Sequence, residues 1–188
     1  GPVRGVGIRS NAQGLDLNRD FMKLESPEAK ALVRGIYCDY DPHLVIDLHT
    51  TNGSAHGYAL TFSPPLVPAG HPDIIAFLRN LMLKEAQRDM KERGFATYYY
   101  GNFRDAADPA KGWETFDHRP RFGNNYAGLR NRLTVLSEAY SYRDFKDRID
   151  STYHFLLALF ASAARHGKGV LDLIDRVDRE TVTEARDV

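Results

Sequence analysis

Apolar and polar positions along this chain alternate between short continuous runs and longer periodic segments. Two runs, HLVIDLHT over 43–50 and RLTVLSEAY over 132–140, are rich in Val, Ile and Leu, which is typical of buried strands. The segments GYALTF and ATYYY predict two further strands. Apolar residues at helical spacing predict helices over 26–40, over 72–93 and over 142–167, with a charged amphipathic helix from Lys168.

Local signals fix several ends of these elements. Ser26 is a suitable helix N-cap, and Pro27 suits the first helical position that follows. The dipeptide Asp41-Pro42 stops that helix, and Gly94 ends the helix over 72–93. Residues 1–24 predict a short strand and then a loop, and residues 101–126 predict one long loop.

Strands that alternate with helices predict an α/β fold with a mixed, largely parallel sheet flanked by helices. The length of 188 residues suits a single domain that spans 1–188. In such sheets, functional side chains gather where strands end. The two most polar strand ends, IDLHT and LSEAY, are therefore the first places to look for a site.

Composition narrows the classes of partner. Lys plus Arg and Asp plus Glu number 25 each, so nothing points to nucleic acid or to an anionic membrane. The single cysteine, Cys38, excludes an internal disulfide. No apolar stretch reaches the length of about 18 residues that a membrane-spanning helix needs. We therefore expect neither nucleic acid nor a membrane among the partners.

His49 ends one apolar strand, and Asp47 stands two residues before it. Alternation along a strand places both side chains on the same face. Asp47 then has the position of a carboxylate that orients a metal-binding imidazole. A histidine that only caps the strand end by hydrogen bonding is the simpler alternative.

Glu138 ends the other buried strand. A carboxylate there is costly unless it is paired or functional, and partial desolvation raises its pKa, which suits a general base. The alternative is a salt bridge to Arg130 or Arg132. If either arginine instead points into a cleft, acidic substrate side chains are favoured.

A polar cluster stands near the start of the chain, in GLDLNRDF over 14–21. Arg9 precedes Asn18 by nine positions, and Arg19 follows directly. A guanidinium matches a carboxylate geometrically and stays charged when it is buried. Asn18 and Arg19 can therefore hold a substrate carboxylate, and Arg9 can stabilise an oxyanion. The alternative is a surface turn held by side-chain hydrogen bonds.

Together, DLNRDF, VIDLHT and LTVLSEAY occur in an order that resembles the zinc metallocarboxypeptidase family, of the carboxypeptidase A and D type, over roughly residues 5–165. The resemblance implies that His49 binds zinc and that Asn18 and Arg19 bind the C-terminal carboxylate of a peptide. It also implies that Arg9 polarises the scissile carbonyl and that Glu138 moves protons between a zinc-bound water and the leaving amine. The implied function is a zinc-dependent hydrolase.

The sequence departs from the family in its metal ligands. The family's first two ligands come from a His-x-x-Glu motif before the Asn-Arg pair, and no histidine precedes Asn18 here. We expect the chain to be the C-terminal part of a longer catalytic domain, with the missing segment as a partner. It would then be inactive alone. The alternatives are a natural zinc-free relative and a site in which zinc uses other groups, such as His56 or His118.

The resemblance also implies a mobile tyrosine that covers the substrate. Tyr126 is the candidate for substrate binding, although it stands close to Glu138 in sequence, and position 116 is Phe116. The three tyrosines of TYYYGNF, over 97–103, are interpreted mainly as half-buried packing.

Two other functions fit the same residues. One is an N-acyl amino acid deacylase similar to succinylglutamate desuccinylase and aspartoacylase, which also recognises a carboxylate and would take a small acylated amino acid. The other is a domain that binds peptide C-termini through Asn18 and Arg19 without cleaving them. A deacylase and a peptidase differ in the substrate that they cleave. A binding domain differs from both because it shows no turnover.

Overall fold

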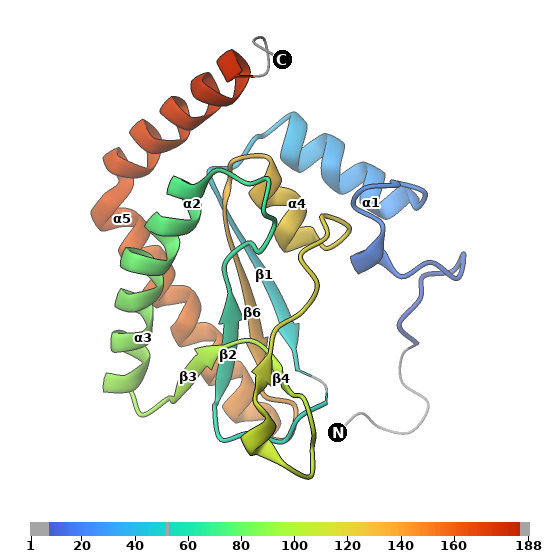
Figure 1. Ribbon diagram of the computed structural model, residues 1–188, viewed down its shortest axis with the longest axis vertical. Coiled ribbons are helices and arrows are strands. Elements are labelled where there is room, and N and C mark those ends of the chain that lie inside the picture. The colour runs from blue at the N-terminus through green and yellow to red at the C-terminus, as the bar shows by residue number, and fades with distance from the viewer. Residues whose placement is uncertain (1–7, 52, 185–188) are drawn as a thin grey trace.

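Four strands form one mixed sheet. The computed structural model describes residues 8–51 and 53–184, and the sheet lies between helices on both faces (Figure 1). In sheet order the strands are β1 (Leu44–Thr50), β6 (Leu133–Ala139), β2 (Leu60–Ser63) and β3 (Thr97–Tyr99). β1 pairs with β6 and β2 with β3 in parallel, whereas β6 and β2 are antiparallel. The predicted α/β class with a largely parallel sheet is confirmed.

The register between β1 and β6 brings two strand ends together. Because these strands are parallel, their C-terminal ends lie at the same edge of the sheet. His49 on β1 is the register partner of Glu138 on β6. The strands predicted over 43–50 and 132–140 are thus confirmed, and they place two candidate residues side by side.

One face of the sheet carries the main hydrophobic core. The helices on this face are α2 (Pro72–Phe77), η3 (Leu78–Met82), α3 (Leu83–Glu92) and α5 (Phe145–Glu184). Phe62 of β2 and Phe155 of α5 are fully buried here, with ring centroids 5.5 Å apart. Glu85 links α3 to α5: hydrogen bonds from Arg165, Ser162 and His166 hold the pKa of its carboxyl at about 2.

The opposite face carries α1 (Pro27–Leu32), η2 (Val33–Cys38) and α4 (Gly123–Leu129). Val33, Tyr37 and Ala127 form a smaller buried cluster there. The predicted N-cap of the first helix is confirmed, since the Ser26 hydroxyl accepts a hydrogen bond from the amide of Ala29. Helix geometry continues past α1 as the wider turns of η2, and the structure ends it at Cys38.

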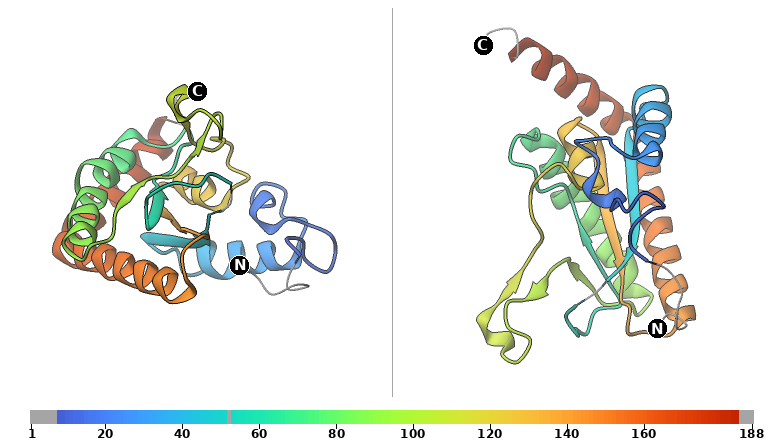
Figure 2. Two further views of the ribbon diagram at one scale, coloured as in Figure 1. Left: turned by 90° about the horizontal axis from the view of Figure 1, so that it is seen from below. Right: turned by 90° about the vertical axis from the view of Figure 1, so that its right-hand side faces the viewer.

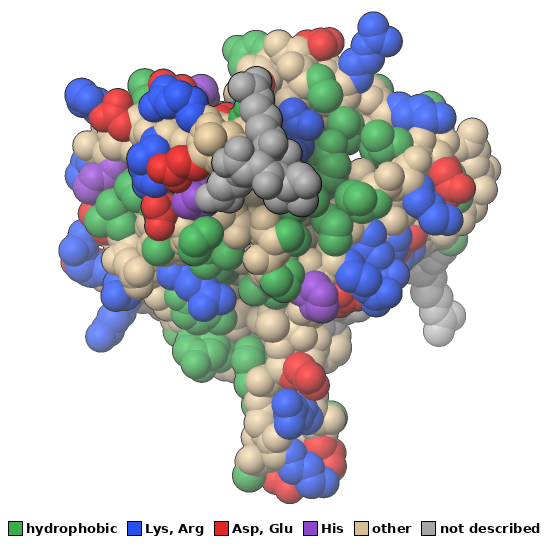
Figure 3. All heavy atoms as spheres, turned by 45° about the horizontal axis from the view of Figure 1, so that its top comes forward, with side chains coloured by type: hydrophobic (Ala, Val, Ile, Leu, Met, Phe, Trp, Pro, Cys, Tyr) green, Lys and Arg blue, Asp and Glu red, His purple; other side chains and the backbone are tan. Residues whose placement is uncertain are grey.

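A small antiparallel hairpin projects from the body. Its strands are β4 (Asn102–Phe103) and β5 (Trp113–Glu114), and the right panel of Figure 2 shows it reaching away from the main sheet. The projection carries both charge signs, as Figure 3 shows at its lower end. Lys111 pairs there with Asp105, and Arg104 with Glu114. The prediction of one long loop over 101–126 is therefore wrong, because this range contains the hairpin and the start of α4.

Two other predictions differ from the structure. The helix predicted to end at 167 continues without interruption through α5, because Val170, Ile174 and Val177 keep packing into the core. No strand forms in residues 8–24, where the chain makes turns and the short 3-10 helix η1 (Leu17–Arg19). The part of that prediction in residues 1–7 lies outside the described residues.

The described helices also bear on a membrane location. No helix within residues 8–51 and 53–184 combines the length and the apolar character that crossing a bilayer requires. Cys38 is exposed and forms no disulfide.

Candidate functional site

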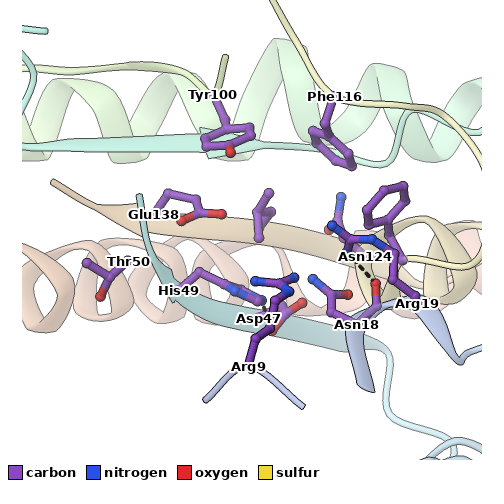
Figure 4. A pocket seen from close by; sticks show the side chains of 12 residues that line it. Arg9, Asn18, Arg19, Asp47, His49, Thr50, Tyr100, Phe116, Asn124 and Glu138 are labelled. Atoms are coloured by element: carbon purple, nitrogen blue, oxygen red, sulfur yellow. Dashed lines mark hydrogen bonds and ion pairs between the residues drawn. The ribbon is translucent and has the colours of Figure 1, made fainter. Parts of the chain in front are cut away.

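A cavity of about 380 Å³ opens where β1 and β6 end, and it gathers most of the candidate residues (Figure 4). Four segments far apart in the sequence supply its walls: residues 9–19, the C-terminal part of β1, the stretch around 100–124, and the C-terminal part of β6. The lining residues are Arg9, Asn18, Arg19, Asp47, His49, Thr50, Tyr100, Phe116, Phe122, Asn124, Leu136 and Glu138. His49, Glu138 and Arg19 thus face the same space.

His49 and Asp47 lie on the same face of β1, as the alternation predicts. Nε2 of His49 is 2.9 Å from Oδ1 of Asp47. This hydrogen bond is the main cause that raises the pKa of His49, and the charges of Asp47 and Glu138 add to it against the cost of burial. When Nε2 carries the proton that is donated to Asp47, the lone pair of the neutral ring is on Nδ1. Asp47 therefore orients the imidazole.

Glu138 is a buried carboxyl with an unusual pKa. Its exposed fraction is only 8%. Burial raises the pKa of Glu138 to about 7, and the charge of Asp47 adds to this, whereas His49 and Arg9 oppose it. A raised pKa is what the sequence predicts for a desolvated carboxylate at this strand end. Near neutral pH the group can therefore both accept and release a proton.

The predicted alternative for Glu138, a salt bridge to Arg130 or Arg132, is wrong. Arg132 is buried and forms ion pairs with Asp41 and Asp178. Arg130 donates a hydrogen bond to the carbonyl oxygen of Tyr37. Both arginines stand next to the N-terminal end of β6, whereas Glu138 is near its C-terminal end. Neither lines the cavity, so the condition for a preference for acidic substrate side chains is not met.

The segment around residues 9–20 is shaped by its acidic residues. Asp16 forms an ion pair with Arg9 and accepts a hydrogen bond from the amide of Asn18, which starts η1. Asp20 is buried and accepts hydrogen bonds from both the amide and the hydroxyl of Ser26. The predicted turn held by side-chain hydrogen bonds therefore forms, and it presents Asn18 and Arg19 to the cavity.

Asn18 and Arg19 join this segment to the start of α4. Oδ1 of Asn18 accepts a hydrogen bond of 3.1 Å from the amide of Gly123, which leaves its NH₂ group for the cavity. The guanidinium of Arg19 lies 4.4 Å from the centre of the Phe122 ring and donates to the carbonyl oxygen of Asn18 at 2.6 Å. Because Gly123 lies against the ring of Phe21, a side chain at 123 would disturb this arrangement.

The guanidinium of Arg19 forms no ion pair among the described residues. In the described part of the chain no carboxylate lies within ion-pair distance of its guanidinium. Burial is the main cause that lowers the pKa of Arg19; the charge of Asp16 opposes this change, and the positive charges of Arg9 and Arg121 add to it. An anion placed at this end of the cavity would relieve both costs. The site is therefore built to attract a negative group.

An aromatic wall faces these polar groups, and the sequence gives little sign of it. The ring of Phe116 lies 5.8 Å from that of Tyr100 and 5.4 Å from that of Phe122. Tyr100 precedes β4 and Phe116 follows β5, so the hairpin brings them together. In Figure 4 both rings lie across the cavity from His49 and Asn18. Burial raises the pKa of Tyr100, and the charge of Glu138 adds to this.

Two residues with a predicted role lie elsewhere. Tyr126 packs in the smaller cluster, with its ring centroid 5.8 Å from that of Phe21 and 5.7 Å from that of Tyr37. It does not line the cavity, so the described structure lends no support to its expected role in substrate binding. His56 stacks on Tyr140 at 4.3 Å and also lies outside the lining.

The donor set of the cavity does not by itself fit a zinc ion. Structural and catalytic zinc sites use at least three protein ligands. Within residues 8–51 and 53–184, no group of three or more His, Cys, Asp or Glu side chains could hold a metal ion. His49, oriented by Asp47, has the form of one such ligand. His56 and His118 do not join it in the lining.

Comparisons with known proteins add no relative. No family model, no curated protein and no solved structure matches the chain.

Proposed function

We propose that the cavity is the substrate site of a carboxypeptidase-type amide hydrolase, similar to zinc metallocarboxypeptidases, which binds the free C-terminal carboxylate of a peptide. The observation that carries this proposal is that two groups line the same cavity. One is Arg19, which has no carboxylate partner in the described structure, and the other is the carboxyl of Glu138, whose pKa is about 7. The first group binds the chain end and the second moves a proton at the adjacent amide.

Carboxylate binding is supported by three donors on one side of the cavity. Arg19 offers a guanidinium held in place by Phe122, and Asn18 offers its NH₂ group. Arg9 lies nearby and already shares its charge with Asp16. A charge-assisted hydrogen bond from an arginine to a carboxylate is about twice as strong as a neutral one. A terminal carboxylate is the ligand that suits this set.

Glu138 supports the hydrolytic part of the proposal. A general base works best when its pKa lies near the working pH, and the pKa of Glu138 is about 7. The ionised form accepts a proton from an attacking water, and the protonated form donates it to the leaving amine. Arg9 would steady the negative charge that develops on the carbonyl oxygen. Both Glu138 and Arg9 line the cavity.

We predict that the purified chain holds less than stoichiometric zinc and shows no peptidase activity. His49 alone supplies one ligand, and one imidazole binds zinc too weakly to retain it. Elemental analysis by mass spectrometry after dialysis checks this prediction. Zinc at one equivalent in the dialysed chain would contradict it, and would mean that other groups of this chain complete the site.

The aromatic wall indicates the type of substrate residue. Tyr100, Phe116 and Phe122 offer apolar surface beside the carboxylate-binding donors. Aromatic pairs of this kind are favourable in offset or edge-on arrangements. We therefore propose peptides that end in an aromatic or large aliphatic residue. Among the described residues, no basic side chain joins Arg9 and Arg19 in the lining to pair with an acidic terminal residue.

Two matched peptides test carboxylate recognition. We expect N-acetyl-glycyl-phenylalanine with a free carboxylate to bind at least about tenfold more tightly than its C-terminal amide, because only the acid forms charge-assisted hydrogen bonds with Arg19. Isothermal titration calorimetry at fixed salt measures both affinities. Equal affinities would show that the cavity does not recognise a chain end, and the proposal would then be abandoned.

The single metal ligand favours a second candidate, a domain that binds peptide C-termini without cleaving them. The carboxylate-binding donors are all in place, whereas the described residues form no metal-binding group. The chain alone is expected to show no turnover, so the change Glu138→Gln separates the two candidates in a longer chain that supplies the remaining metal ligands. In an enzyme it abolishes turnover at nearly unchanged affinity, whereas in a binding domain it leaves affinity intact and there is no turnover to lose.

A further inference from the structure

A second row of aromatic rings lies just outside the substrate cavity. Three segments supply it: the residues after β6, the loop between β1 and β2, and β3. Its rings, in order, are those of Tyr142, Tyr140, His56, Tyr58 and Tyr98, and neighbouring ring centroids lie 5.4, 4.3, 5.6 and 5.0 Å apart. We call these five residues the outer ring row. None of them lines the cavity itself.

The register of the sheet places the outer ring row beside Glu138. Glu138 of β6 is the partner of Thr61 on β2, and Thr61 is the partner of Tyr98 on β3, so these side chains share one face of the sheet. The amide of Tyr140 donates to the carbonyl oxygen of Ala59, which continues the ladder past the end of β6. Alternation therefore puts Tyr140 on the same face as Glu138.

A peptide held in the cavity as proposed would leave it toward this row. Figure 4 shows Arg19 and Thr50 at opposite ends of the cavity, with Glu138 near the Thr50 end. Thr50 marks the end where both strands finish, since it is the register partner of Ala139. A peptide with its carboxylate at Arg19 and its last amide at Glu138 therefore directs its preceding residues past the strand ends.

The length of the peptide backbone sets which residues reach the row. Tyr140 stands two residues beyond Glu138, and two residues of a strand span about 7 Å. Two residues of an extended peptide cover the same distance. The third and fourth residues from the end of the peptide chain would therefore lie against the outer ring row.

The packing within the row favours an aromatic ligand. His56 stacks on Tyr140 and Tyr58 stacks on Tyr98, so these ring faces are covered and ring edges remain available. The two end rings, of Tyr142 and Tyr98, expose 67% and 44% of their residues' surface. The edge of an aromatic ring is positive and prefers the negative face of another ring. An aromatic side chain therefore suits the row better than an aliphatic one.

The row offers no charge to a ligand near neutral pH. The amide of Tyr58 donates to Nδ1 of His56 at 3.2 Å, which leaves the proton of the neutral imidazole on Nε2. Burial lowers the pKa of His56, so its ring stays neutral. Acidic and basic side chains of a peptide therefore gain no ion pair from the row itself.

We propose that the outer ring row is a second recognition site for the peptide substrate, which binds an aromatic side chain at the third or fourth residue from the chain end. This inference rests on the proposed function, because binding of the terminal carboxylate at Arg19 sets the direction of the peptide. The substrate class is then peptides of at least four residues that carry an aromatic residue before the cleaved one.

Three tetrapeptides test this preference. Two carry tyrosine, N-acetyl-tyrosyl-alanyl-glycyl-phenylalanine and N-acetyl-alanyl-tyrosyl-glycyl-phenylalanine, and the third carries alanine at both positions. The isolated chain is expected not to cleave them, so calorimetry measures equilibrium affinities. We expect the tighter of the two tyrosine peptides to bind at least about threefold more tightly than the alanine peptide.

Trp113 reports where the peptide binds. It is the only tryptophan of the chain, and its ring centroid lies 5.7 Å from that of His56. A peptide with 4-nitrophenylalanine in place of the preferred tyrosine should quench the emission of Trp113 at saturation, because the nitroaromatic group would lie close to the indole. The alanine peptide should leave this emission unchanged.

Two variants provide the matched comparison. The double change Tyr98→Ala with Tyr142→Ala removes both exposed ends of the row and should abolish the advantage of the tyrosine peptide. Affinity for the alanine peptide should stay within about twofold, which shows that the cavity is still formed. Tyr40, which follows η2 outside the row and exposes 81% of its surface, is the control. Tyr40→Ala should preserve the advantage.

The two levels of the argument fail in different ways. If the C-terminal amides of the tetrapeptides bind as tightly as the acids, the proposed function fails, and this inference fails with it. If the acids bind more tightly but tyrosine adds less than about threefold, the proposed function stands and the outer ring row has no role. Unchanged emission of Trp113 at saturation, or equal effects of the double variant and Tyr40→Ala, would overturn the inference in the same way.

Discussion

Replacing Glu138 with Gln is expected to raise the free energy of unfolding by about 3 kcal/mol above about pH 8, while the gain falls below about 1 kcal/mol near pH 4. The side chain keeps its shape and loses only its charge. Few single substitutions stabilise a protein this much, because most of them destabilise it. The effect follows from the burial of a carboxyl that has no ion-pair partner among the described residues.

The sign of the pH dependence follows from the direction of the pKa change. The pKa of Glu138 is about 7 in the folded chain, against 4.5 for an ordinary glutamate. Between these values the folded state binds the proton and the unfolded state does not, so stability of the wild type falls as pH rises. Each pKa unit is worth about 1.4 kcal/mol, which gives a total of about 3 kcal/mol. Glutamine has no such dependence.

Urea unfolding of both proteins across this pH range measures the gap. The exposed Glu92 at the end of α3 provides a control, because Glu92→Gln should change the free energy of unfolding by less than about 0.5 kcal/mol at every pH. A gap between wild type and Glu138→Gln that stays constant with pH would show that Glu138 is not the desolvated acid of this cavity.

Replacing Arg19 with Met is expected to weaken binding of a peptide with a free C-terminus by 30- to 100-fold, or about 2–3 kcal/mol. Methionine preserves much of the apolar contact with Phe122 but offers no donor and no charge. Binding of the matching peptide amide should change little, since the lost donors serve the carboxylate. Calorimetric titration of both peptides measures the two effects.

Arg121 is the matched control for this experiment. Its guanidinium lies 5.0 Å from the same Phe122 ring, but it contacts Asp117 and does not line the cavity. Arg121→Met should therefore leave affinity for the free acid within about twofold of the wild type. If both variants weaken binding equally, the general positive potential rather than Arg19 itself attracts the peptide.

The strands and their polar ends could be predicted from the sequence because their signals are local. A buried parallel strand reads as a short apolar run, and β1 and β6 both do. Alternation alone places Asp47 beside His49, and the structure confirms it with a distance of 2.9 Å. What the sequence could not give is the register that makes His49 the partner of Glu138, since this depends on contacts across about 90 residues.

The elements that were missed are those held by tertiary contacts. The helix α4, with sequence GNNYAGL, has two glycines and two asparagines, which are weak helix formers. Its asparagines bond to distant groups instead: Asn124 donates to the carbonyl of Pro64, and Asn125 accepts from the amide of Leu66. Gly128 packs so closely on Pro65 that a Cβ would lie 2.3 Å away.

The hairpin was missed for a similar reason, and with it the aromatic wall. Strands of two residues carry no periodicity, and this pair is fixed by Trp113, whose indole donates to the carbonyl of Tyr99 and packs on Phe103. Tyr100 and Phe116 become neighbours only through this pairing.

The ion pairs of Arg132 also depend on residues far away in the sequence. Its two acidic partners stand about 91 residues before it and 46 after it.

A crystal structure of the chain with bound N-acetyl-glycyl-phenylalanine is the most direct test of the central claim, that one cavity surrounds the last amide bond of a peptide. The account predicts the terminal carboxylate within hydrogen-bond distance of Arg19 and Asn18, the aromatic ring against Phe116, and the amide bond between Arg9 and Glu138. A peptide bound with its carboxylate on another surface, or with its amide bond away from Glu138, would contradict it.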